Sequence, residues 1–239
     1  MTGFDDSTGT ARLLTSLQLS DSAFPSGFYT MSHGLEGFHQ RGLVDGDSVG
    51  DLLEDMLVST VGPGDATALA RAHGAAARRE WDAVTDFDRQ LFASKLNLEL
   101  RLASTRSGRQ LADIARETFA GTTGGDDIAE WAGLVKARRT PGCQAIVTGV
   151  CYAAAGVPAA QAVASDLFAF AVSYAGAALR LRLTDHRSTQ VLLRRVQPVI
   201  EAAAADAVVR PASDIGGFTP VGDIMSAGHE RVEARLFTS

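Results

Sequence analysis

The chain has 239 residues, of which 46% are hydrophobic and 21% are charged, and its formal net charge is −6. This composition is typical of a globular protein with a sizeable core, and the length does not exclude a single domain. The acidic balance argues against general affinity for nucleic acid or for an anionic membrane surface, because both attract a basic protein surface.

The first ten residues are polar and acidic and lack the basic start and apolar core of a signal peptide, so we expect 1–10 to be a disordered N-terminus. Two cysteines, Cys143 and Cys151, lie in a later alanine-rich run. On a helix this spacing would separate them by about 12 Å, whereas a disulfide needs Cα atoms within about 7 Å. We therefore expect reduced core cysteines, as is usual in the cytosol.

Apolar residues recur at helical spacing along almost the whole chain, and alternating, strand-like runs are scarce. In the first half, helices are expected to begin near Leu13, Gly27, Asp47, Asp65 and Asp86. The sequence Gly62-Pro63-Gly64 is expected to stop the third of these helices, and Ser104 to Gly108 is expected to be a break.

In the second half, the predicted helix starts and caps are Leu111, Asp126 or Asp127, Thr140, Pro158 for the longest helix, and Asp185. The charge-poor stretch 140–165 is long enough to span a bilayer, but three glycines and a proline interrupt it, so buried helices are predicted instead. The pattern predicts one all-α domain over 11–209, a bundle of about ten helices. A loop and a flexible C-terminal tail are predicted over 210–239.

Alanine is heavily used between residues 141 and 183. Because each alanine buries little apolar area, a helix such as Ala162 to Leu183 has to be surrounded on several sides. It is therefore either the central helix of the bundle or part of a subunit interface, and the two interpretations are compatible.

Motifs for nucleotide binding and hydrolysis are absent from the sequence. It has no Gly-Lys pair for a P-loop and no Gly-x-Ser-x-Gly elbow. A helical enzyme would need a deep polar pocket with convergent titratable groups, and no spacing predicts one. We therefore expect no catalytic site and no cofactor. The arginine pairs at 78–79, 138–139 and 194–195 are either solvated helix faces or docking points for an acidic partner.

Five histidines are present, without a Cys-x-x-Cys or His-x-x-x-His pattern. His33 and Glu36 would share one face of a helix, and we interpret His33 as a hydrogen-bonded helix residue rather than a ligand. His229, followed by Glu230, could donate one ligand to a metal site shared between subunits. No metal site of the chain's own is predicted, and His33 and His229 are the only candidates.

Three stretches resemble the urease accessory protein UreF family. Residues 17–36 read LQLSDSAFPSGFYTMSHGLE, residues 99–109 read ELRLASTRSGR, and residues 229–239 read HERVEARLFTS. In the first stretch the residues of the structural motif are Pro25, Gly27, Tyr29, Ser32, His33, Gly34 and Glu36. Departures from the family pattern occur at Thr238, often Arg, at 141–144, where members often carry His, and at 184–190, usually rich in Gly and Gln.

The resemblance implies an all-α, usually dimeric and cytoplasmic accessory protein without a metal cofactor. Such proteins bind UreD, also called UreH, and recruit the nickel-carrying GTPase UreG. The complex docks on the urease apoprotein so that nickel and carbon dioxide reach its lysine-carbamate site. The tail is implicated in the UreD contact, so the expected partner-binding residues are His229, Glu230, Arg235, Leu236 and Phe237.

These roles agree with the residue types. The tail is too short and polar to fold alone, but a partner could order it by taking Leu236 and Phe237 into pockets with Arg235 at the rim. The corner from Phe24 to Tyr29 is interpreted as a packed helix–helix corner, with direct partner contact as the alternative. For the whole chain, the alternative is a divergent UreF-like paralogue that serves another metalloenzyme.

Overall fold

The computed structural model describes residues 6–22, 24 and 31–217. In these ranges every regular element is helical, which confirms the all-α prediction. The α-helices are α1 Asp6–Ser20, α2 Leu35–Gln40, α3 Val49–Met56, α4 Thr67–Ala76, α5 Trp81–Ser94, α6 Leu98–Thr118, α7 Gly125–Lys136, α8 Gln144–Ala154, α9 Ala159–Arg180, α10 His186–Arg195 and α11 Gln197–Val209. A π-helix, η2 (Leu57–Ala66), joins α3 to α4, and a 3-10 turn, η3 (Ala212–Asp214), follows α11.

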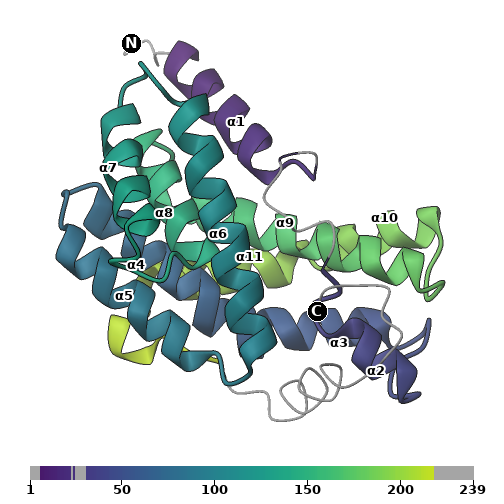
Figure 1. Cartoon of the computed structure of the whole chain (residues 1–239). Coiled ribbons are helices and arrows are strands. Elements are labelled where there is room, and N and C mark those ends of the chain that lie inside the picture. The colour runs from purple at the N-terminus through teal and green to yellow at the C-terminus, as the bar shows by residue number, and fades with distance from the viewer. Residues whose placement is uncertain (1–5, 23, 25–30, 218–239) are drawn as a thin grey trace.

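Helix α9 runs through the middle of the bundle (Figure 1). It packs against α1, α4, α8, α10, α11 and η2, so its small side chains are covered from several directions. This arrangement confirms the central position expected for the alanine-rich helix. By length and apolar composition α9 could also cross a membrane, but the core helix of a bundle has the same properties.

Glycines allow the helices around α8 to approach closely. A Cβ atom at Gly149 would lie 2.6 Å from the carbonyl oxygen of Leu69 in α4. A Cβ atom at Gly108 in α6 would overlap the carbonyl oxygen of Gly142, just before α8. The prediction of a break at Ser104 to Gly108 was therefore wrong, because this glycine serves close helix packing inside a continuous α6.

The prediction that Gly62-Pro63-Gly64 ends a helix was also wrong. The chain widens there into η2 and continues directly into α4. Pro63 lies inside this π-helix, so the chain stays helical past a residue that has no N–H to donate and that would break an α-helix. The hydroxyl of Thr67 donates to the carbonyl oxygen of Gly62 (2.9 Å), which stabilises the wide turn.

Other boundaries differ from the expected ones. α1 begins at Asp6, so residues 6–10 are helical rather than disordered. A helix is expected from Gly27 to Gln40, and of this range the structure describes residues 31–40. There α2 begins at Leu35, because His33 and Gly34 just before it both have positive φ, 54° and 83°. The helix expected at Asp86 already begins at Trp81.

The caps of the second half are partly as expected. Asp185 accepts hydrogen bonds from the N–H groups of Arg187 and Ser188, which confirms it as the N-cap of α10. The N-cap of α7 is Gly124 rather than Asp126 or Asp127, with φ 84°. The N-cap of α8 is Cys143, because the Thr140 side chain bonds elsewhere.

Candidate functional site

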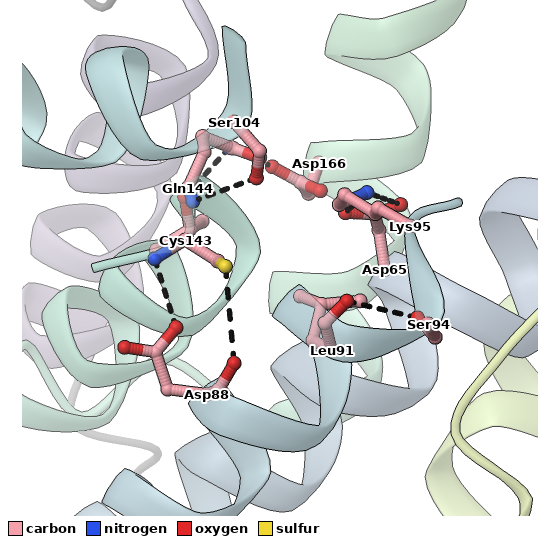
Figure 2. Close-up of polar contacts among 10 residues, drawn as sticks. Asp65, Asp88, Leu91, Ser94, Lys95, Ser104, Cys143, Gln144 and Asp166 are labelled. Atoms are coloured by element: carbon pink, nitrogen blue, oxygen red, sulfur yellow. Dashed lines mark hydrogen bonds and ion pairs between the residues drawn. The ribbon is translucent and has the colours of Figure 1, made fainter. Parts of the chain in front are cut away.

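A buried carboxylate holds the start of α8 against α5. Asp88 is fully buried and accepts hydrogen bonds from the N–H group of Gly142 (2.6 Å) and from the hydroxyl of Thr140. It also accepts one from the N–H group of Cys143 (2.8 Å), which Figure 2 shows. A negative group at a helix N-terminus is favoured by the helix dipole. Asp88 therefore acts as a cap supplied by another helix.

A second buried carboxyl group lies further along the same core. Asp166 of α9 accepts a hydrogen bond from the side-chain amide of Gln144 (2.9 Å), which also donates to the hydroxyl of Thr148 (2.8 Å). Burial raises the pKa of Asp166 from 3.8 to about 6, the Gln144 bond opposes that shift, and the charge of Asp65 adds to it. Figure 2 shows Asp166 between Gln144 and the ion pair of Asp65 with Lys95. In that ion pair, Nζ of Lys95 lies 2.9 Å from both carboxylate oxygens of Asp65.

Asp166 and Gln144 form part of the wall of a pocket of about 180 Å³. The end of α1 and the turn after it line the pocket on one side, and α8 and α9 line it on the other. Its remaining lining residues are Leu19, Ser20, Asp21, Ser22, Leu111, Thr148, Tyr152, Ala169, Val172, Ser173, Gly176 and Arg180.

Burial holds the two cysteine thiols and the Tyr152 phenol around α8 in their neutral forms. Burial raises the pKa of the Cys151 thiol to about 12 and raises the pKa of Cys143 further, so neither is a ready thiolate. Both cysteines are free and buried, which confirms the absence of a disulfide between them. Burial also raises the pKa of Tyr152. Among the residues that the structure describes, no three His, Cys, Asp or Glu side chains are placed to hold a metal ion.

His33, in the motif of residues 17–36, contacts α9. Its Nε2 atom lies 2.8 Å from the hydroxyl oxygen of Ser173, and its ring packs on Phe170 with 4.5 Å between ring centroids. Burial, and secondarily the charge of Arg180, lower the pKa of His33 to about 3, so it is neutral at physiological pH. Contrary to expectation His33 is not helical, and it shares no helix face with Glu36.

The other motif and tail residues fall into two groups. Ser32 and Glu36 are buried, and Gly34 adopts the positive φ that favours glycine. The predicted residues outside the described ranges are Pro25, Gly27, Tyr29, His229, Glu230, Arg235, Leu236 and Phe237.

Two of the arginine pairs contribute ion pairs within the chain. Arg79, in the turn after α4, bonds to Asp127 (2.5 Å) and Glu130 (2.8 Å) of α7. Arg195 of α10 bonds to Asp51 (2.5 Å) and Glu54 (2.8 Å) of α3. These arginines are at least partly engaged within the chain, which favours the interpretation as ordinary helix faces.

Sequence reasoning missed two exposed apolar surfaces. One lies on α1, at Leu13, Leu14 and Leu17, and the other at the corner between α5 and α6, at Leu96, Leu98 and Leu102. The sequence of α6 could have predicted the exposure of Leu98 and Leu102. Small residues such as Ala103, Ser107 and Gly108 form the buried face of this helix, and the two leucines lie on another face.

Comparison with known proteins gives the family. The UreF family model matches residues 43–197. The urease accessory protein UreF of Arthrobacter sp. (strain FB24) is 34% identical over 224 residues, covering 93% of this chain and 95% of that protein. UreF 2 of Brucella canis is 30% identical over 225 residues (94% and 91%), and UreF of Azorhizobium caulinodans is 32% identical over 219 residues (90% of each). The chain belongs to the UreF family of urease accessory proteins.

Proposed function

We propose that this chain is a non-catalytic scaffold for nickel delivery to urease in the cytoplasm. In this role it binds UreD (UreH), recruits the GTPase UreG, and presents the complex to the urease apoprotein. It acts as a homodimer and has no cofactor of its own. The observation that carries the proposal is the family match, supported by relatives named urease accessory proteins along more than 90% of the chain.

The chemistry of the core supports a scaffold. Asp88 is engaged by three donors at the start of α8, and Asp166 is bonded to Gln144. Such groups stabilise one arrangement of helices and give no activated nucleophile. The two exposed leucine surfaces fit a protein that works by binding others.

We assign the UreD contact to the tail. Leu236 and Phe237 would fill apolar pockets of the partner, Arg235 would lie at the rim, and His229 and Glu230 would add polar contacts. A truncation within the tail leaves every residue that the structure describes, up to 217, in the chain.

A truncated chain ending at residue 234 tests this assignment. We expect its affinity for the UreD protein of the same organism to fall by about 100-fold or more, because both apolar anchors are lost. Affinity is measured by titration with purified partner, and circular dichroism checks the fold. The control is Thr238→Arg, which restores the common family residue and should bind at least as well as the native chain. A truncated chain with native affinity would overturn the tail assignment.

The wider role is tested by reconstitution with UreD, UreG and apo-urease of the same organism. We expect a complex containing all three accessory proteins and urease activation that depends on this chain. If the chain stays alone and urease matures without it, the alternative role as a paralogue for another metalloenzyme is favoured.

A further inference from the structure

One of the three arginine pairs differs from the other two in lacking a carboxylate partner. Arg79 and Arg195 form ion pairs with residues of neighbouring helices. Arg138 and Arg139 follow the end of α7 and are both exposed. In the part of the chain that the structure describes, no carboxylate forms an ion pair with either of them. Their guanidinium groups can therefore bind an anionic group of another molecule.

Two further arginines, from two other helices, lie beside this pair. The Nη2 atom of Arg89 in α5 donates to the carbonyl oxygen of Arg139 (3.4 Å). The Cγ atom of Arg109 in α6 would lie 3.6 Å from a Cβ atom at Gly142, three residues after Arg139. Both of these arginines are exposed as well. Arg89, Arg109, Arg138 and Arg139 thus gather in one region of the surface, and we call them the arginine cluster.

The backbone that carries Arg138 and Arg139 has a fixed shape. The N–H of Arg138 donates to the carbonyl oxygen of Val135 (3.0 Å), and the N–H of Arg139 donates to that of Leu134 (3.0 Å). These are the two bonds of a Schellman motif at the end of a helix. The segment that follows is held by its hydrogen bonds to the buried Asp88 of α5. A binding loop that is already ordered loses less conformational freedom when a partner docks.

The charges around the cluster indicate which kind of partner fits it. A guanidinium group binds a carboxylate through two parallel hydrogen bonds. The whole chain has a net charge of −6, so the cluster reverses the sign of the charge locally. Two carboxylates lie close to it, Asp86, 3.4 Å from Arg89, and Asp113, one turn after Arg109 in α6. They would repel nucleic acid or an anionic membrane that extended past the cluster. A short acidic segment of a protein fits better.

We propose that the arginine cluster is the docking site for a segment rich in Asp or Glu on another protein of the urease activation complex. This inference rests on the proposed function, in which the chain brings UreD, UreG and the urease apoprotein together. Complementary charges on two protein surfaces mainly speed their association, and salt screens the attraction. The contact at the arginine cluster is therefore strongest at low salt.

The test is the double variant Arg138→Gln/Arg139→Gln in the full-length chain, which removes two charges and leaves the cluster otherwise intact. Association and dissociation rates are measured with purified UreD, UreG and urease apoprotein of the same organism. For the protein that carries the acidic segment, affinity should fall about 10-fold at about 50 mM salt, mainly through slower association. At about 500 mM salt the loss should be less than about twofold. Thermal unfolding checks that the helical body is unchanged.

The matched control is Arg182→Gln/Arg187→Gln, which changes the net charge by the same amount. Arg182 and Arg187 are exposed, and Arg182 follows the end of α9 with φ 60°, as Arg138 follows α7 with φ 55°. This control should bind all three proteins within about twofold of the native chain. Equal losses of affinity in the two double variants would reflect net charge alone and would overturn the inference.

Three further outcomes would also overturn it. The first is native affinity of the Arg138→Gln/Arg139→Gln variant for all three proteins, a result that leaves the proposed function standing. The second is a native chain that binds none of the three, in which case the proposed function fails as well. The third is that the native chain binds a short DNA duplex or vesicles containing phosphatidylserine, and that the variant loses this binding alone. The cluster would then belong to a nucleic acid or a membrane.

Discussion

Helices α1 and α9 pack against each other, but α9 buries its large apolar side chains whereas α1 exposes most of its leucines to solvent. In α9, Leu167 and Tyr174 are fully buried although much of the helix is alanine. In α1, Leu14 and Leu17 are 60% and 57% exposed, whereas Ser16 is buried. The less apolar face of α1 is therefore the face that meets the bundle.

The surface beneath α1 explains this difference. The end of α1 covers a pocket whose wall includes Gln144 and Asp166, and α1 contributes Leu19 and Ser20 to its lining. One turn earlier, the buried Ser16 accepts a hydrogen bond from the side-chain amide of Gln161 in α9 (3.4 Å), so polar groups of the two helices pair where they meet. The face that a helix buries is thus decided by its neighbour as well as by its own composition. The leucines of α1 remain available to another chain.

The largest expected effect of a substitution lies on the α9 side of this comparison. Leu167→Ala should lower the free energy of unfolding by about 2–5 kcal/mol, because it leaves a cavity in the packed core. Leu13→Ala on α1, where the side chain is half exposed, should cost less than about 0.5 kcal/mol. Urea denaturation of both variants gives the two values. Equal losses of unfolding free energy in the two variants would show that Leu13 is packed as tightly as Leu167 and would contradict the difference between the two helices.

A second prediction uses pH to sharpen the role of the polar pocket wall. The pKa of Asp166 is raised in the folded chain, so the folded state binds its proton more tightly than the unfolded state does. Its contribution to stability is therefore fully present below about pH 4 and is lost as pH rises through about 6. With about 1.4 kcal/mol for each pKa unit, the loss is on the order of 3 kcal/mol.

Asp166→Asn isolates this contribution. The asparagine oxygen can still accept the hydrogen bond from Gln144, and the side chain no longer ionises. We expect the variant to be more stable than the native chain at pH 7, by about 1–3 kcal/mol, and equal to it near pH 4. Urea denaturation across this pH range measures the difference. A constant difference would show that Asp166 does not titrate in this window.

The helical fold could be predicted because it depends on local patterns. Periodic apolar residues predicted the helices, Pro158 preceded the longest one, and Asp185 was identified as a cap. The wrong helix boundaries came from positions where glycine or proline was interpreted as the end of a helix. Gly108 serves close packing inside α6, and Pro63 lies inside a π-helix, and both depend on contacts with distant segments that sequence spacing does not show.

The site could be predicted less well for the same reason. The motif around His33 was identified, but its partner Ser173 lies 140 residues away. Asp88 and Asp166 were not singled out, because a lone aspartate in a helix usually faces water. Their partners come from the segment around α8, and only the folded chain brings these groups together.

The smallest expected effect returns to α1. Leu14→Ser/Leu17→Ser should change the free energy of unfolding of the isolated chain by less than about 0.5 kcal/mol, because both side chains already contact water. Urea denaturation at low protein concentration measures this value. The matched control is Leu19→Ser, because Leu19 lines the pocket, and this variant should lose about 1 kcal/mol or more of its free energy of unfolding. A loss above about 1 kcal/mol in the double variant would mean that the leucine face of α1 is covered in solution. If that loss also depends on protein concentration, the cover is a second copy of the chain, because stability linked to association follows mass action.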